Sequence, residues 1–216
     1  MRFELIVFDW DGTLMDSAGA IVASIRAAAI DLGVAPPEEA RARHVIGLGL
    51  HDALRYAVPD LPEGRYGAMA DRYRHHYLAQ DHQLTLFDGI GQLIAELAAA
   101  GHALGVATGK SRLGLDRALR QSRLGTAFQA TRCADECHSK PHPQMLEELM
   151  AELGVSAQAT LMIGDTTHDV EMAHNAGVAA LAVAYGAHPR AALEALSPLA
   201  CAASVGELAH WLRSNA

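Results

Sequence analysis

The chain has 216 residues, of which half are hydrophobic and 19% are charged. This composition supports one compact domain, or a core with a modest inserted subdomain, and argues against a disordered chain. Acidic residues outnumber Lys and Arg by 25 to 17, and no basic run stands out, which argues against nucleic acid or an anionic membrane surface as a partner.

Targeting signals and cysteines set the expected compartment. No stretch approaches the ~20 apolar residues of a membrane span. The apolar run at residues 5–8 is too short for a secretory signal. The cysteines Cys133, Cys137 and Cys201 are odd in number and lack the paired spacing of a zinc site. We therefore expect a soluble cytoplasmic protein with free thiols, no membrane partner, and a monomeric or homodimeric state.

Four continuous apolar runs predict strands that are buried on both faces, as in a parallel sheet. The runs span residues 5–8, 103–107, 160–163 and 179–184. Helical patterns alternate with the later runs, and glycine follows the last helical residue of several of them, as expected of a helix C-terminus. The alternation predicts an α/β fold with a doubly wound parallel sheet, that is, a Rossmann-like core.

The segment from residue 17 to residue 84 breaks this alternation. It contains helical patterns at residues 18–32, 38–43, 50–56 and 63–79, separated by prolines, and no convincing strand. An all-helical block between the first strand and the rest of the sheet is typical of an inserted cap. We therefore predict a catalytic core over residues 1–16 and 85–216 and a helical cap over residues 17–84.

Polar groups follow the predicted strands at the edge where an open α/β sheet binds its ligands. They are Asp9, Asp11 and Gly12 after the first strand, Thr108 and Gly109 after the second, Asp165 with Asp169 after the third, and Lys140 in a loop before a helix. Each pattern taken alone has a plain structural explanation. Asp11-Gly12 fits an ordinary turn, and Thr166 to Asp169 fits a helix capping box. Their joint occurrence at strand ends favours a functional site.

Four of these residues are carboxylates, namely Asp9, Asp11, Asp165 and Asp169. Two such charges ~4 Å apart repel by about 4 kcal/mol at an effective dielectric near 20. A converging cluster therefore requires a cation, and oxygen ligands together with a substrate phosphate favour Mg²⁺. We predict a magnesium site formed by these four residues.

The spacing of Asp9 and Asp11 suits a division of labour in phosphoryl transfer. Asp9 would attack phosphorus, while Asp11, re-aimed by the following Gly-Thr turn, would protonate the leaving oxygen and then activate water. Thr108 and Lys140 would bind the phosphoryl oxygens. The loop amides near Gly12 and Gly109 would add hydrogen-bond donors.

In these residues the sequence resembles the haloacid dehalogenase-like superfamily, on its phosphatase side. Residues 9–17 match the first motif, 107–111 the second, 139–143 the third and 164–169 the fourth, in the family's order and over essentially the whole chain. The resemblance is strongest to the phosphoglycolate phosphatase-like branch, with a first-type helical cap. It implies hydrolysis of a small, phosphoglycolate-like phosphate monoester through an aspartyl-phosphate.

The resemblance also implies a role for each matching residue. Asp9 would be the nucleophile and Asp11 the acid/base. Magnesium would be held by the Asp9 carboxylate, the Asp11 backbone carbonyl and Asp165, with Asp169 acting directly or through water. Lys140 would bind phosphate and neutralise Asp9.

Other functions stay open at this stage. A dehalogenase of the same superfamily needs neither a proton donor nor a metal, which would leave Asp11 and Asp165 without a purpose. A phosphomutase shares the core residues, but Leu50 stands where the related sugar-phosphate mutases carry arginine. A receiver-like signalling protein or a non-catalytic phosphate-binding protein would combine similar acidic residues, although a receiver would lack the helical block.

Overall fold

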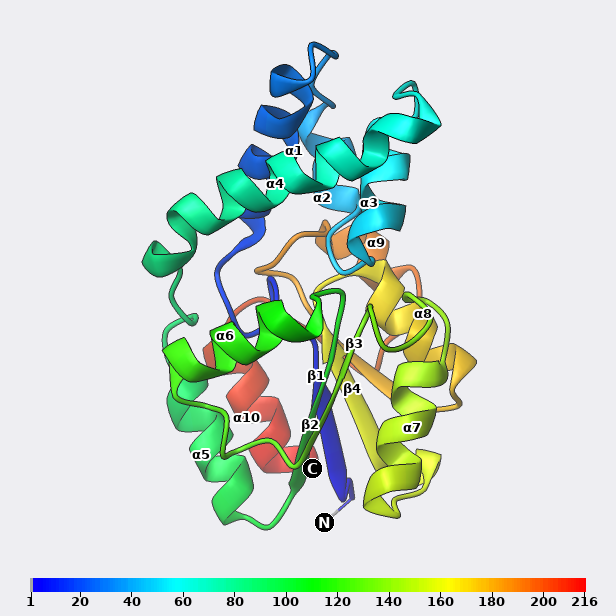
Figure 1. Cartoon of the computed structure of the whole chain (residues 1–216). Coiled ribbons are helices and arrows are strands. Elements are labelled where there is room, and N and C mark those ends of the chain that lie inside the picture. Colours follow the sequence, from blue (N-terminus) through cyan, green and yellow to red (C-terminus); the bar gives the residue numbers. More distant parts are fainter. Residues whose placement is uncertain (1) are drawn as a thin grey trace.

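The computed structural model describes residues 2–216 and is built around one six-stranded parallel sheet (Figure 1). The strands are β1 (Leu5–Phe8), β2 (Ala103–Thr108), β3 (Ala130–Cys133), β4 (Thr160–Gly164), β5 (Ala179–Val183) and β6 (Cys201–Ala202). Their order is β3-β2-β1-β4-β5-β6, and every neighbouring pair is parallel. The chain winds outward from β1 on one side and returns to β4 on the other, so a topological switch point lies between these two strands. The predicted doubly wound α/β fold is confirmed.

The two strands at the edges of the sheet, β3 and β6, were not predicted from the sequence. β3 carries the polar residues Thr131 and Arg132, and both are only partly buried. β6 is two residues long. An edge strand pairs on one side only and needs no continuous apolar run, which is why periodicity did not indicate either strand.

Helices cover both faces of the sheet (Figure 1). They are α5 (Ile90–Ala99), α6 (Arg112–Ser122), α7 (Gln144–Leu153), α8 (Thr167–Asn175), α9 (Arg190–Glu194) and α10 (Val205–Asn215). Side chains of α5, α6 and α10 share one hydrophobic cluster with Phe8 and Ile163, while α7, α8 and α9 share another with Leu5 and Val7. The burial of β1 on both faces explains its unbroken apolar run.

Local capping signals fix several of these helices. The predicted capping box opens α8, where the Thr166 hydroxyl accepts a hydrogen bond from the Asp169 amide and the Asp169 carboxylate accepts one from the Thr166 amide. Gly154 ends α7 in the left-handed conformation, at φ +69°. The five-residue helix α9 was not predicted, because it is too short to show a helical period.

Between β1 and α5 the chain forms helices and no strand. These are α1 (Ala18–Asp31), α2 (Glu39–His44), α3 (Leu50–Ala57) and α4 (Tyr66–Gln80), with short 3₁₀ turns at Glu63–Arg65 and Asp81–Gln83; a further 3₁₀ turn, Ala157–Ala159, precedes β4. The four helices lie beyond the carboxyl ends of the strands (Figure 1) and pack around a cluster of their own that includes Ile25, Leu54 and Met69. We call residues 17–84 the helical segment. That it acts as a separate cap domain stays a prediction.

Among residues 2–216, no helix is both long enough and apolar enough to cross a bilayer.

Candidate active site

The loop after β1 turns sharply, and this turn sets the two aspartates of the first motif at different places. Asp9 continues the strand, and its amide donates to the Ile163 carbonyl at 2.9 Å. Gly12 then takes φ +81°, and the amides of Leu14 and Met15 both donate back to the Trp10 carbonyl. A Cβ atom at position 12 would lie 2.1 Å from Asp165 Oδ2, so glycine is required there both by conformation and by close approach.

Three carboxylates converge beyond β1 and β4. Asp9, Asp165 and Asp169 each place an oxygen within 4.8 Å of the others, and all three are at most 1% exposed. Lys140 lies among them, with Nζ 2.8 Å from Asp9 Oδ1 and 2.6 Å from Asp169 Oδ1. One ammonium against three carboxylates leaves two negative charges uncompensated if all of them ionise, in a site with no water exposure to screen them.

The pKa values report this electrostatic conflict. Burial raises the pKa of Asp9 to about 7; the nearby Lys140 charge lowers it in part, and Asp169 and Asp11 raise it further. Burial, followed by the charges of Asp9 and Asp169, raises the pKa of Asp165 well above its ordinary value. Burial would lower the pKa of Lys140, but the Asp169 and Asp9 carboxylates outweigh it, so the ammonium stays charged. A cation among the carboxylates would relieve the conflict.

The donor set fits such a cation. Asp9 Oδ2 is buried and accepts no hydrogen bond from any residue in the described range 2–216. Asp165 is held in place by the Thr13 hydroxyl and the Ala187 amide, each 2.7 Å away. Unsatisfied, oriented carboxylate oxygens are ligands of the kind that Mg²⁺ prefers. Asp11 differs from the other three because its side chain is turned away from this cluster.

Asp11 is held by two neighbours. Its Oδ1 accepts a hydrogen bond from the Ser17 hydroxyl at 2.6 Å and lies 2.9 Å from Lys110 Nζ. Ser17 stands at the N-cap position of α1 but makes no side-chain cap bond, because its hydroxyl is committed to Asp11.

Lys110 connects Asp11 to the helical segment. Besides Asp11, its ammonium contacts the Tyr77 hydroxyl at 3.0 Å, and Tyr77 lies on α4. Burial would lower the pKa of Lys110, but the Asp11 carboxylate outweighs this effect and raises it. The contact between Lys110 and Asp11 was not predicted from the sequence. Only the fold brings positions 11, 77 and 110 together.

Thr108 and Gly109 end β2 beside this group. Thr108 is fully buried, and its hydroxyl accepts a hydrogen bond from the Lys110 amide at 3.2 Å. Gly109 faces the helical segment, and a Cβ atom there would lie 2.6 Å from the Gly47 carbonyl oxygen and 2.5 Å from that of Leu48. The absence of a side chain at Gly109 thus allows the loop after α2 to contact the core directly.

The same loop lies over the nucleophile candidate. A Cβ atom at Gly47 would lie 4.0 Å from Asp9 Oδ2 and 3.3 Å from the Thr166 hydroxyl. The amide of Gly49 donates to the Ser139 hydroxyl at 2.8 Å. The helical segment is therefore docked on the core, with its loop directly above Asp9.

Three histidines form a second contact between the helical segment and the core. His168 Nε2 and His188 Nε2 approach the backbone carbonyl of His44 at 2.7 and 3.1 Å, and His188 Nδ1 accepts from the Thr167 amide at 3.0 Å. Burial and the charge of His168 lower the pKa of His188 to about 4, so its ring is neutral at pH 7. The three rings also lie close enough to share a metal ion. However, both nitrogens of His188 are already hydrogen-bonded, so the cluster is best described as a clamp on the His44 carbonyl.

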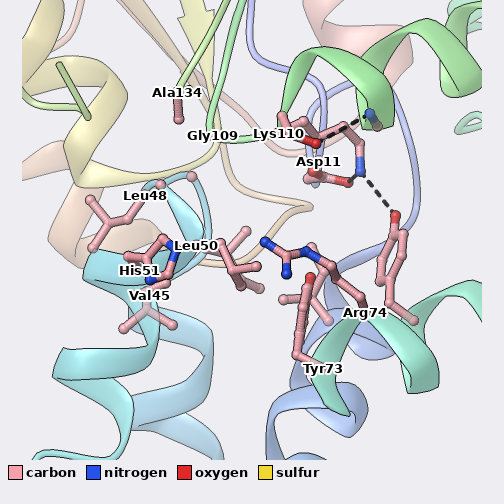
Figure 2. A pocket seen from close by; sticks show the side chains of 18 of the residues that line it. Asp11, Val45, Leu48, Leu50, His51, Tyr73, Arg74, Gly109, Lys110 and Ala134 are labelled. Carbon is pink, nitrogen blue, oxygen red and sulfur yellow. Dashed lines mark hydrogen bonds and ion pairs between the residues drawn. The ribbon is translucent and has the colours of Figure 1, made fainter. Parts of the chain in front are cut away.

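A cavity of about 430 Å³ opens between the helical segment and the core. Its inner end is formed by Asp11, Gly109 and Lys110, and its outer part by side chains of α1, α3, α4 and α6. Figure 2 shows Leu50 and Arg74 on opposite sides of this space, with Lys110 beyond them. The cavity is thus continuous with the group that holds Asp11.

The comparisons with known proteins identify the family. A family model described as haloacid dehalogenase-like hydrolase matches residues 6–183. The chain belongs to this family. The resemblance seen in the four motifs is therefore confirmed, and the chain is a hydrolase of the phosphatase type.

Individual relatives agree with this assignment. The chain is 38% identical to the probable phosphatase IndB of Dickeya dadantii over 202 residues, which cover 90% of this chain and 86% of that protein. It is 30% identical to a 5′-nucleotidase of Pseudomonas aeruginosa, over 100% of this chain and 98% of that one. A crystal structure of a predicted phosphoglycolate phosphatase from Haemophilus somnus 129PT superposes with a TM-score of 0.85 at 24% identity, covering 100% of this chain and 99% of that one, which shows the shared fold.

Proposed function

We propose that the chain is a magnesium-dependent phosphatase that hydrolyses a small phosphate monoester through a phosphoryl group carried on Asp9. The observation that supports this most is the buried Asp9, which has an unpartnered Oδ2 and lies between Lys140 and the carboxylates Asp165 and Asp169. Among residues 2–216, Asp9 Oδ2 forms no hydrogen bond that would give it a structural role. In a haloacid dehalogenase-like hydrolase, an unpartnered carboxylate oxygen of this kind can bind a cation or attack phosphorus.

The metal site would consist of the Asp9, Asp165 and Asp169 carboxylates and the Asp11 backbone carbonyl. A bound Mg²⁺ would neutralise the acidic cluster and the charge of the substrate phosphate. Asp165 is oriented for this by Thr13 and the Ala187 amide. Asp169 is shared between Lys140 and the start of α8.

In the first step, an Asp9 carboxylate oxygen forms a bond to phosphorus while the bond from phosphorus to the ester oxygen breaks. Asp11 gives its proton to the departing oxygen. Lys140 and Thr108 bind the phosphoryl oxygens as charge accumulates on them, with the loop amides near Gly12 and Gly109 as further donors.

In the second step, Asp11 takes a proton from water, whose oxygen bonds to phosphorus as the bond to Asp9 breaks. The docked helical segment supports this chemistry, because its loop covers Asp9 and limits access of bulk water. Ser17 and Lys110 keep Asp11 turned toward the cavity in which the leaving group would lie.

Phosphoglycolate is the substrate candidate from the sequence, and we place the reaction in the reducing cytoplasm. The three cysteines, all of them free thiols within residues 2–216, support that compartment. The proposed partners of the enzyme are small phosphate esters.

An isotope experiment separates this chemistry from that of a dehalogenase. Turnover in H₂¹⁸O should place the label in the released phosphate and leave Asp9 unlabelled, because water attacks phosphorus. In a dehalogenase, water attacks the carbonyl of an aspartyl ester, so mass spectrometry would find ¹⁸O in the Asp9 peptide. Asp9→Asn should abolish Mg²⁺-dependent hydrolysis of p-nitrophenyl phosphate, and full activity in that variant would rule out the proposal.

A further inference from the structure

The cavity beside Asp11 is larger than a phosphoglycolate-sized leaving group requires. Glycolate has five non-hydrogen atoms, which fill about 150 Å³ even at the roughly 30 Å³ that one water occupies in the liquid. The cavity measures about 430 Å³ while the helical segment is docked on the core. A glycolate group would leave most of this space to water, whereas specific small-molecule sites bury most of their ligand.

Aliphatic side chains form much of the cavity wall, next to polar residues such as His51 and Ser111. Ile21, Ile25 and Val45 line it from the helical segment and are each at most 8% exposed, and Leu48 and Leu50 line it as partly buried residues. None of these five side chains can donate or accept a hydrogen bond. Such a surface gains from contact with an apolar group and offers little to a polyol or to a second phosphate.

Two leucines extend this surface to solvent at the mouth of the cavity. Leu78 on α4 is 46% exposed and Leu113 on α6 is 71% exposed, and both are among the lining residues. They come from the helical segment and from the core, respectively. Large exposed apolar side chains around one opening are a feature of ligand-binding grooves.

The cations of the cavity are already paired. Lys110 contacts Asp11 at 2.9 Å, and Arg117 contacts Asp81 at 2.7 Å. Arg74 contacts Asp71 at 3.0 Å in an exposed pair, which is weak, so its guanidinium is the group available to a hydrogen-bond acceptor on a ligand. Arg74 is therefore the one cation of these three that can meet a ligand, which is too little positive charge for a strongly anionic leaving group.

We propose that the substrate is the phosphate monoester of an alcohol with an apolar or aromatic body of about six or more non-hydrogen atoms, bearing at most one acceptor for Arg74. This inference rests on the proposed function, since the cavity takes the leaving group only if phosphate is bound beside Asp9. Leu78 and Leu113 contact the outer end of that body. They set specificity and take no part in the chemistry.

Binding of n-alkylphosphonates tests the inference without turnover, because their C–P bond is not cleaved by this chemistry. The dissociation constants of ethyl-, butyl- and hexylphosphonate are measured by calorimetry in the presence of Mg²⁺. We expect affinity to rise by up to about fourfold for each added methylene that the cavity buries. A constant or falling affinity from ethyl to hexyl overturns the inference.

Matched variants place the effect in the cavity. Leu78→Asn and Leu113→Asn should each weaken hexylphosphonate binding by about threefold or more and leave ethylphosphonate binding within about twofold. Leu199→Asn is the control, because Leu199 is also 46% exposed and lies outside the cavity lining. Equal losses for Leu78 and Leu199 variants would refute the assignment of the mouth.

The same ligands separate this inference from the proposed function. If alkyl phosphates are hydrolysed but chain length has no effect on kcat/KM or on phosphonate affinity, the inference fails and the phosphatase stands. If phosphonate affinity rises with chain length while no phosphate ester is hydrolysed, the proposed function fails. A kcat/KM for phosphoglycolate above that for hexyl phosphate also overturns the inference.

Discussion

Replacing Asp9 by asparagine should stabilise the metal-free protein while removing its activity. In the absence of a metal, Asp9 lies fully buried beside Asp165 and Asp169, and its pKa is raised from 3.8 to about 7, chiefly by burial. The unfolded chain releases this proton near pH 3.8, while the folded protein holds it to about pH 7. The folded state therefore loses stability relative to the unfolded state as the pH rises through this window.

The magnitude follows from the size of the pKa difference. About three pKa units correspond to roughly 4 kcal/mol at pH 8, where the full cost applies. Asp165 titrates together with Asp9 and shares this cost, so we expect a gain of about 2–4 kcal/mol for the Asp9→Asn variant. At pH 5 the gain should fall to about 1–2 kcal/mol, because the folded wild-type carboxyl is then largely protonated.

Urea denaturation measures the effect, in EDTA at pH 8 and pH 5 and again at pH 8 with saturating Mg²⁺. Bound Mg²⁺ should stabilise the wild type much more than the variant. The ion compensates the negative charge of the carboxylate cluster, and the variant lacks one of these carboxylates. Asp60→Asn serves as the control, because Asp60 is exposed. A variant that is no more stable than the wild type in EDTA at pH 8 would show that the buried cluster carries no such strain.

Three further predictions address the neighbours of the cluster. Asp11→Asn should slow hydrolysis of alkyl phosphates by about 10²–10⁴-fold and that of p-nitrophenyl phosphate much less, because nitrophenolate leaves without a proton; equal losses in kcat on both substrates would argue against Asp11 as the acid. Gly186→Ala would place a Cβ atom 2.3 Å from the Asp165 carboxylate. The variant should therefore lower the free energy of unfolding by about 1–3 kcal/mol and raise the Mg²⁺ concentration needed for half-maximal activity. An unchanged Mg²⁺ requirement would contradict the tight fit of Gly186 against Asp165. Burial holds the pKa of His188 near 4, so below about pH 6.5 the unfolded chain binds a proton at His188 that the folded protein does not bind. His188→Gln should therefore lessen the loss of stability between pH 6.5 and pH 4. An unchanged dependence of the free energy of unfolding on pH would refute this prediction.

The sequence by itself determined the four inner strands of the sheet and the polar residues at their carboxyl ends. The apolar run of β1 is buried on both faces because the strand lies in the centre of a parallel sheet, and this burial requires an unbroken pattern that can be seen in the sequence. Asp9, Thr108 and Asp165 follow strands directly, so parallel pairing alone brings them to one edge. The α8 capping box is likewise local and was predicted from four consecutive residues.

Only the tertiary structure decided which partner each polar side chain takes. Ser17 can cap a helix or bind Asp11, and the local sequence permits both; the position of the Asp11 carboxylate in the folded loop decides between them. The Lys110 contact with Tyr77 joins residues 33 positions apart. Such contacts depend on how the helical segment docks on the core, and docking is set by the packing of surfaces without any repeat along the chain.

The shape of the cavity is also a tertiary property. The sequence shows aliphatic residues on α1 and α3 and in the loop between α2 and α3, which is equally consistent with a fully packed core. The docked arrangement leaves Leu78 and Leu113 at one opening, although 35 positions separate them along the chain. Side-chain packing density, and hence unfilled volume, depends on the relative placement of all the elements around it, so periodicity in the sequence cannot predict it.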